Sequence, residues 1–402
     1  MRIMKDSGIA WIGEIPIDWN KNKVFRIFDI IGSGTTPKSN NEQNFNGTIK
    51  WIQSGDINGA ELFDCKTSIS ENAFNSSSAL KIYRAPYIII AMYGASVGNI
   101  SISNIDACVN QACCVLGGRV YNLKYAYYAL KTAKDYLVWK AVGGGQPNIS
   151  QDTIKQLWLP DPSQKAKERI ARFLDVKCSH IDSVIEKTRA AIEEYKKLKQ
   201  AVITQAVTKG IRPNREMKDS GIEWIGDIPK EWKIGKAKHY VSITNGSDPK
   251  YDGDIPVYGS GANSFKTCGE YKEGPCVLIG RKGATLHIPH YIDHNYWNVD
   301  TAFDVKPLKS YNLRYYYYTA CCFDYKLYIS QTTLPGMTQT NYENMFVPAP
   351  NLSEQTEIVA HLDEKTAAID FLIKKKEQLI SELEAYKKSL IYEYVTGKKE
   401  VI

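Results

Sequence analysis

Two long segments of the chain carry an apolar residue at every third or fourth position and contain neither proline nor glycine. The first runs from about Ser163 to Thr208 and the second from Leu352 to Thr396. This spacing places the apolar side chains on one face of an α-helix, so each segment predicts one continuous helix. At 1.5 Å per residue, about 45 residues form a rod of roughly 68 Å.

The apolar stripes predict that the two rods pack against each other. A lone amphipathic helix is marginal in water, whereas two rods of equal length bury their stripes as an antiparallel coiled coil. Thr188 and Lys376 occupy equivalent positions in the stripes and either fix the register or face solvent. The predicted stripes are Ile170, Leu174, Ile181, Val184, Ile185, Ile192, Tyr195, Leu198 and Val202, and Ile358, Leu362, Ile369, Leu372, Leu379, Leu383, Tyr386 and Leu390.

The sequence outside the rods alternates over much shorter distances. Residues 20–160 contain short apolar runs such as GTIKWIQSGDI and APYIIIAMYG, separated by turn residues, and these predict strands. The stretch YNLKYAYYALKTAKDYL has helical spacing and predicts a helix packed on the sheet. Each globular part is therefore predicted to be an α+β module.

The chain repeats itself. Residues 4–19 return as residues 217–232 with twelve of sixteen positions identical, at a shift of 213. Further matches follow in the same order, and from Pro160 onward the shift is constant at 188. The second copy has therefore lost about 25 residues between Trp232 and Pro348. Similar flanks and divergent middles predict two modules with one framework and two different reading surfaces.

The composition of the chain excludes few classes of protein. The net charge of +7 and pI near 8.7 permit a polyanionic partner without requiring one. Nine cysteines without C-x-x-C spacing are expected to be reduced, and no apolar run is long enough to span a bilayer. We therefore expect a cytoplasmic protein with no membrane association. The 26 tyrosines suit a contact surface, or are half-buried in the sheets.

The order of parts resembles the specificity subunit of Type I restriction-modification systems, which act in phage defence. The resemblance rests on the DSG, W-IG, IP, W segment, a variable module, a proline-flanked junction and a long helix, all repeated. It implies target-recognition domains at residues 1–162 and 213–350 and spacer helices at residues 163–212 and 351–402. Each domain would read one half of an asymmetric, interrupted sequence in double-stranded DNA.

The resemblance also implies partners and cofactors. The helices would set the gap and bind two methyltransferase subunits, with endonuclease/translocase subunits added for cleavage. S-adenosylmethionine, ATP and Mg²⁺ are expected on those partner subunits, and no cofactor is expected in this chain.

Candidate DNA-binding residues are polar side chains beside glycine in both copies. Such groups bond base edges and phosphates, although Ser, Thr, Asn and Gln in turns often only satisfy their own backbone. Arg281 is the strongest candidate, the alternative being a salt-bridged surface arginine. The candidates are Gln53, Ser54, Tyr93, Ser96, Gln146 and Asn148 in the first copy, and Tyr258, Ser260, Arg281, Lys282, Thr285, Thr332, Thr333, Gln339 and Asn341 in the second.

Catalytic motifs are not found in the sequence. It contains no N-P-P-Y-like or D-P-P-Y-like tetrapeptide, and GGGQP lacks the lysine and hydroxyl of a phosphate-binding loop. The histidines of HIPHYIDH, at residues 287, 290 and 294, are better explained as partly exposed side chains than as a zinc site. A non-catalytic subunit is expected. The alternatives are a stand-alone methyltransferase or nuclease with an unrecognised site, or a coiled-coil scaffold that binds DNA.

Overall fold

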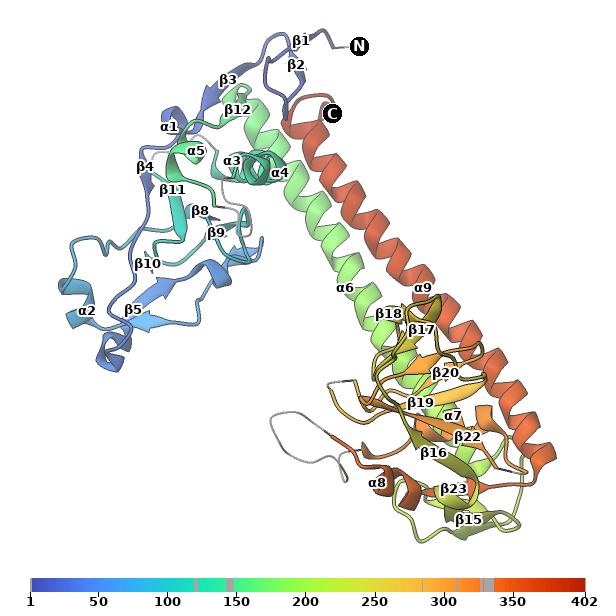
Figure 1. The fold of residues 1–402 in the computed structure, drawn as a ribbon. Helices are drawn as coiled ribbons and strands as arrows, with labels where there is room; N and C mark the ends of the chain where they lie inside the picture. The colour runs from blue at the N-terminus through green and yellow to red at the C-terminus, as the bar shows by residue number, and fades with distance from the viewer. Residues whose placement is uncertain are drawn as a thin grey trace. The chain divides into compact units, whose positions relative to one another are not determined.

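The computed structural model describes residues 2–118, 122–141, 148–283, 285–308, 310–325, 328 and 336–401. The chain divides into two compact units. The first comprises Met1–Glu186 and Ile380–Ile402, and the second comprises Lys187–Leu379. Each unit contains one globular module together with part of both long helices, α6 (Gln164–Lys209) and α9 (Leu352–Val395) (Figure 1). No helix in these ranges is long and apolar enough to cross a membrane.

The module of the first unit is built on two mixed sheets. Its elements are β1 (Met4–Asp6), β2 (Glu14–Pro16), β3 (Asn20–Lys23), α1 (Val24–Ile27), β4 (Ile30–Gly32), η1 (Glu42–Asn44), β5 (Phe45–Ile52), η2 (Ser54–Asp56), β6 (Glu61–Leu62), β7 (Ser68–Ile69), α2 (Glu71–Asn75), β8 (Tyr87–Ala91), β9 (Ile100–Ser103), β10 (Cys108–Val109), β11 (Cys113–Gly117), α3 (Leu123–Thr132), α4 (Lys134–Trp139), α5 (Gln151–Lys155) and β12 (Trp158–Asp161). The larger sheet has the order β4-β11-β8-β9-β6, and the smaller one the order β10-β5-β7. Strand β8 is buried at every position, which explains its unbroken apolar sequence.

The module of the second unit repeats this plan with fewer residues. Its elements are β13 (Met217–Asp219), β14 (Asp227–Pro229), β15 (Lys233–Lys236), η3 (Ala237–His239), β16 (Val241–Asn245), β17 (Ile255–Tyr258), β18 (Lys266–Cys268), β19 (Cys276–Gly280), β20 (His290–Ile292), β21 (Trp297–Asn298), β22 (Ala302–Pro307), α7 (Leu313–Ala320), α8 (Gln339–Asn344) and β23 (Phe346–Ala349). The sheets have the orders β16-β22-β19-β20 and β18-β17-β21. The prediction of two α+β modules in tandem is confirmed.

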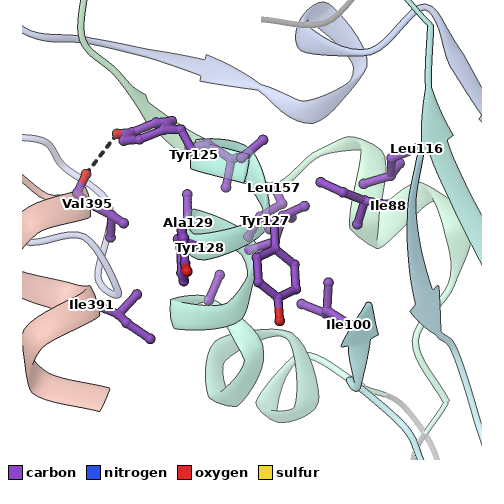
Figure 2. Packing of buried hydrophobic residues seen from close by; sticks show 14 of the residues in the cluster. Ile88, Ile100, Leu116, Tyr125, Tyr127, Tyr128, Ala129, Leu157, Ile391 and Val395 are labelled. Atoms are coloured by element: carbon purple, nitrogen blue, oxygen red, sulfur yellow. Dashed lines mark hydrogen bonds between the residues drawn. The ribbon is translucent and has the colours of Figure 1, made fainter. Parts of the chain in front are cut away.

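A tyrosine-rich helix joins each module to the long helices. In the first unit α3 lies between the sheet and α9, and the buried Tyr125 hydroxyl donates to the Val395 carbonyl at 2.9 Å (Figure 2). In the second unit the equivalent Tyr315 hydroxyl of α7 donates to the Val207 carbonyl of α6 at 3.0 Å. Burial raises the pKa of both tyrosines well above 10, so both hydroxyls stay protonated and able to donate.

We call the contact of α3 or α7 with the long helices the joint. In each unit a carboxylate on a long helix completes it. Asp175 of α6 accepts hydrogen bonds from Tyr128 (2.8 Å) and Lys124 (2.9 Å). In the second unit, Asp363 of α9 accepts equivalent bonds from Tyr318 (2.5 Å) and from Arg314 Nε (2.7 Å). Many of the tyrosines in YNLKYAYYA and YNLRYYYYT are therefore buried in the packing of these helices.

Helices α6 and α9 pack in antiparallel fashion within each unit. In the first unit Asp182 pairs with Lys387 at 2.5 Å, and in the second Asp370 pairs with Lys199 at 2.7 Å. Thr188, one of the two polar seam positions, is buried rather than solvent-facing. The other, Lys376, is half-buried and lies 5.7 Å from the centre of the Tyr195 ring.

Four residues predicted for the apolar seam are exposed instead. Each lies one position before the residue that occupies the seam under a strict 3.5-residue repeat, so its side chain is rotated away from the partner helix. The exposed residues are Leu198, Leu372, Leu379 and Tyr386, and the residues that follow them are Lys199, Ile373, Ile380 and Lys387.

The repeated segment near residue 4 packs against a helix end. In the first unit Trp19 lies against Gly397, just past α9, and in the second Trp232 lies against Gly210, just past α6. Both glycines have positive φ, +74° and +75°, and a Cβ on Gly397 would lie 2.6 Å from the Pro16 ring. The duplicated W-IG, IP, W residues thus belong to the structural framework.

Replacing Asp363 with Ala is expected to lower the free energy of unfolding by about 1 to 3 kcal/mol, because it leaves Arg314 without its acceptor and the Tyr318 hydroxyl with Thr366 alone. Urea denaturation followed by circular dichroism measures the change. Asp370→Ala, which removes an exposed pair on the same helix, is the matched control and should cost less than about 1 kcal/mol. Equal losses in both variants would contradict the proposed role of the joint.

Candidate nucleic-acid interface

The segments that carry the sequence-predicted DNA-binding residues converge in each module. We call them the candidate loops: residues 53–56, 92–99 and 148–150 in the first unit, and residues 259–265, 281–283 with 285–289, and 336–338 in the second. Three equivalent backbone hydrogen bonds connect their ends, two of them through a neighbouring segment, residues 110–112 in the first unit and 299–301 in the second. They are Asn110 to Ile52, Met92 to Ala112 and Ile149 to Met92 in the first unit, and Val299 to Tyr258, Arg281 to Thr301 and Met337 to Arg281 in the second.

A surface hollow lies at this junction in the second unit. It has a volume of about 360 Å³, and four predicted residues line it, namely Arg281, Lys282, Gln339 and Asn341. Asn245, Tyr328 and Thr338 add further polar groups to its wall. Residues far apart in the sequence thus form one concave surface that carries several polar side chains, which is the form a site for base edges or phosphates takes.

Two more predicted residues of the second unit lie beside this hollow. The Thr285 hydroxyl donates to the Ser260 carbonyl at 3.1 Å, and the Ser260 hydroxyl lies 3.1 Å from the place of a Cβ on Gly283. Tyr258, by contrast, is 8% exposed, and its hydroxyl is bonded to His294 Nε2 at 2.9 Å. Its side chain is therefore used inside the module. Thr332 and Thr333 lie outside the described residues.

The charged groups at the hollow differ in how strongly they are held. Lys282 is exposed. The Arg281 guanidinium lies 3.3 Å from the Asp300 carbonyl and 3.9 Å from its carboxylate, so it is oriented by a weak pair that a phosphate or guanine could replace. The Gln339 side chain is held more firmly, because its amide donates to the Ile243 carbonyl (3.0 Å) and to Glu343 (2.7 Å).

The first unit places its predicted residues at the equivalent position. Tyr93 and Ser96 follow β8, and exposed Asn148 precedes the residue that bonds to Met92. Gln53 follows β5, and its amide donates to the Thr67 hydroxyl at 3.0 Å. Ser54, next to it, is half-buried. Gln146 lies outside the described residues.

A tryptophan anchors the segment that follows the first strand of each larger sheet, and sequence reasoning missed it. Trp51 of β5 donates its indole N–H to the Thr35 carbonyl at 3.2 Å, and Trp297 of β21 donates to the equivalent Ser247 carbonyl at 2.7 Å. Strands β5 and β10 form a parallel pair in the first unit, and β17 and β21 form the equivalent pair in the second. Trp51 lies on the earlier strand of its pair, whereas Trp297 lies on the later strand of its pair. A comparison of aligned positions cannot find such an exchange, because the residues do not align.

His290 supports the loop that contains Ser260. Burial lowers the pKa of its imidazole, and a hydrogen bond to the Ser260 backbone opposes this shift. The ring is therefore mostly neutral near pH 7. No group of three metal-ligating side chains is present among the residues that the structure describes.

The chain matches one known protein family over most of its length. The family described as "Type I restriction modification DNA specificity domain" matches residues 16–194 and 229–382. The chain belongs to this family. The two matched segments coincide with the two copies of the internal repeat, so the specificity domain occurs twice in tandem.

Curated relatives carry the same assignment. The chain is 23% identical over 432 residues to the putative type I restriction enzyme MjaX specificity subunit of Methanocaldococcus jannaschii, covering 97% of this chain and 96% of the relative. It is 26% identical over 245 residues to the MjaIX specificity subunit of the same organism, covering 59% of this chain but only 55% of that relative.

Solved structures confirm the fold of the specificity domains. One is described as "Structural basis underlying complex assembly and conformational transition of the type I R-M system" and matches with a TM-score of 0.74 at 16% identity, over 95% of this chain and 98% of the other. The HsdS subunit from Thermoanaerobacter tengcongensis matches with a TM-score of 0.51 at 15% identity, over 96% and 98% of the two chains.

Trp297→Phe should release the segment around Ser247, because phenylalanine keeps the ring but lacks the N–H donor. We expect a loss of about 1 kcal/mol in stability and faster amide exchange at residues 246–250, measured by hydrogen–deuterium exchange. The segment at Thr35 should exchange as in the wild type. Trp51→Phe is the reciprocal control and should show the opposite pattern, and unchanged exchange in both variants would contradict the anchoring role.

Proposed function

We propose that this chain is the DNA-reading subunit of a Type I restriction-modification complex, in which each module reads one half of an asymmetric, interrupted target. The observation that carries the proposal is the convergence of the candidate loops in both modules of a duplicated specificity domain. A shared framework with different side chains at the same place is what two independent readers of different half-sites require.

The proposed reading surfaces consist of accessible candidates. In the first unit they are Gln53, Ser54, Tyr93, Ser96 and Asn148, and in the second they are Ser260, Arg281, Lys282, Thr285, Gln339 and Asn341. Gln146, Thr332 and Thr333 remain candidates on sequence grounds. Residues 1–162 and 213–350 remain the proposed target-recognition domains. Residues 163–212 and 351–402 remain the proposed spacers.

We propose that α6 and α9 set the gap between half-sites and dock two methyltransferase subunits. The support is the set of apolar side chains that the helices leave exposed outside their seam. Phe371 is 59% exposed, and Leu198, Leu372, Leu379 and Tyr386 are exposed as well. Solvent-facing apolar side chains on otherwise polar helices are typical of a protein–protein contact.

Catalysis and its cofactors are assigned to partners under this proposal. Methyltransferase subunits would supply S-adenosylmethionine, and endonuclease/translocase subunits would supply ATP and Mg²⁺. The chain itself would then contribute selectivity: which DNA is bound and where the methyltransferases are placed on it.

Arg281→Ala tests the reading surface. If the guanidinium bonds a guanine, the variant should lose about 1 to 3 kcal/mol of discrimination at one position of one half-site, with the other half-site unchanged. Sequencing of methylated sites after co-expression with the partner methyltransferase measures this.

Arg84→Ala is the matched control, because Arg84 is an exposed arginine paired with an aspartate on the first module, away from the candidate loops. It should leave the motif intact. A uniform loss of methylation in Arg281→Ala would make this residue a phosphate contact, and an unchanged motif would remove it from the surface.

Phe371→Glu tests the docking surface. A charge in place of an exposed apolar ring should weaken co-purification with the methyltransferase at least tenfold while leaving circular dichroism unchanged. Phe63→Glu makes the same change at an exposed phenylalanine of the first module and should not affect assembly. Equal assembly of both variants would place the methyltransferase elsewhere.

A further inference from the structure

An exposed phenylalanine lies beside the reading surface of the second unit. Phe265 is 61% exposed, and its backbone N–H donates to the Val257 carbonyl at 3.2 Å, which fixes the residue at the end of the loop between β17 and β18. A Cβ on Gly259 would lie 3.8 Å from Cε1 of the ring. The aromatic side chain thus lies next to a glycine, and its outer part is open to solvent.

The surroundings of this ring are those of the reading surface. Gly259 is followed by Ser260, whose carbonyl accepts the Thr285 hydroxyl bond. A Cβ on Gly259 would also lie 2.8 Å from the Thr301 hydroxyl, and the Thr301 carbonyl accepts the backbone N–H of Arg281. The Lys266 ammonium lies 5.7 Å from the centre of the Phe265 ring. An exposed apolar group therefore lies beside a hydroxyl and a cation.

The first unit has different side chains at the position equivalent to Gly259. The Thr67 carbonyl accepts the backbone N–H of Trp51, the residue equivalent to Val257, and Gln53 precedes Ser54 as Gly259 precedes Ser260. There, the Gln53 amide and the Thr67 hydroxyl form a polar pair. In the second unit Gly259 takes the place of Gln53 and Lys266 that of Thr67, and the Phe265 ring lies beside the glycine.

We propose that Phe265 reads the 5-methyl group of a thymine in the half-site of the second module, an inference that rests on the proposed DNA-reading function. The thymine methyl is the apolar group that a base pair presents in the major groove, and phenylalanine is a residue that contacts it. The neighbouring Ser260, Lys266 and Arg281 supply the polar contacts that a methyl reader needs around it. Loss of one buried methyl contact corresponds to about a fourfold change in affinity.

The test replaces each thymine of that half-site, one at a time, with deoxyuridine, which lacks only the methyl group. Duplexes are titrated with the full chain assembled with its methyltransferase. The wild-type complex should bind about fourfold more weakly at one position. Phe265→Ala should bind the natural duplex with a similar loss and should not distinguish thymine from deoxyuridine there. Phe265→Leu, which keeps an apolar side chain, should restore part of the distinction.

Phe63→Ala, at an exposed phenylalanine of the first module, is the control and should keep the wild-type response to deoxyuridine in this half-site. An equal loss for thymine and deoxyuridine in Phe265→Ala would indicate stacking or wedging instead and would overturn the proposal. A half-site without an A·T pair would overturn it as well. If the wild-type complex shows no site-selective binding at all, the proposed function fails rather than this inference alone.

Discussion

The structure depends on the burial of one tyrosine-rich helix in each module against the long helices. Each of these helices, α3 and α7, brings a buried tyrosine hydroxyl to a main-chain carbonyl of a long helix. It also brings a second tyrosine and a cation to one carboxylate, Asp175 or Asp363. A buried hydroxyl without an acceptor is costly, so these contacts fix the position of the helix as well as stabilising it. The sheets, and the loops at their ends, are positioned through this helix.

Because the joint holds each sheet in place, the side chains of the reading surface can differ between the modules while the framework stays the same. Backbone hydrogen bonds join the ends of the candidate loops, so the side chains there can change without loss of the connection. The tryptophan anchors show how far this freedom extends. One carbonyl is held in both modules by an indole N–H, although the indole comes from β5 in one module and from β21 in the other. What is preserved is the hydrogen bond and not the position that supplies it.

The seam between α6 and α9 combines apolar packing with a few polar positions. Lys199 and Lys387 fall at seam positions, and each reaches an aspartate of the other helix, Asp370 or Asp182. A lysine stem can cover apolar surface while its ammonium stays near water, so these positions cost little and favour one register. The apolar residues displaced from the seam are then exposed, and they form the surface that we propose for the methyltransferases.

The sequence by itself determined the duplication, the two long helices, their antiparallel pairing and the α+β nature of the modules, because each follows from a period or a repeat. It also located most candidate residues on the loops that converge, since glycine beside polar residues marks strand ends at both copies. It failed in the order of the steps of three and four: the predicted stripes included Leu198 and Tyr386, whereas the seam uses the next residue in each case.

Only the tertiary structure decided which candidates share a surface and which are used internally. Tyr258 precedes a glycine–serine pair as a candidate reader should, yet its hydroxyl is bonded to His294, 36 residues further along the chain. Phe265 carries no polar group that would mark it in the sequence, and its relevance comes from the position of its ring beside Gly259 in a candidate loop. Side-chain exposure and pairing depend on residues distant in the chain, which local patterns do not contain.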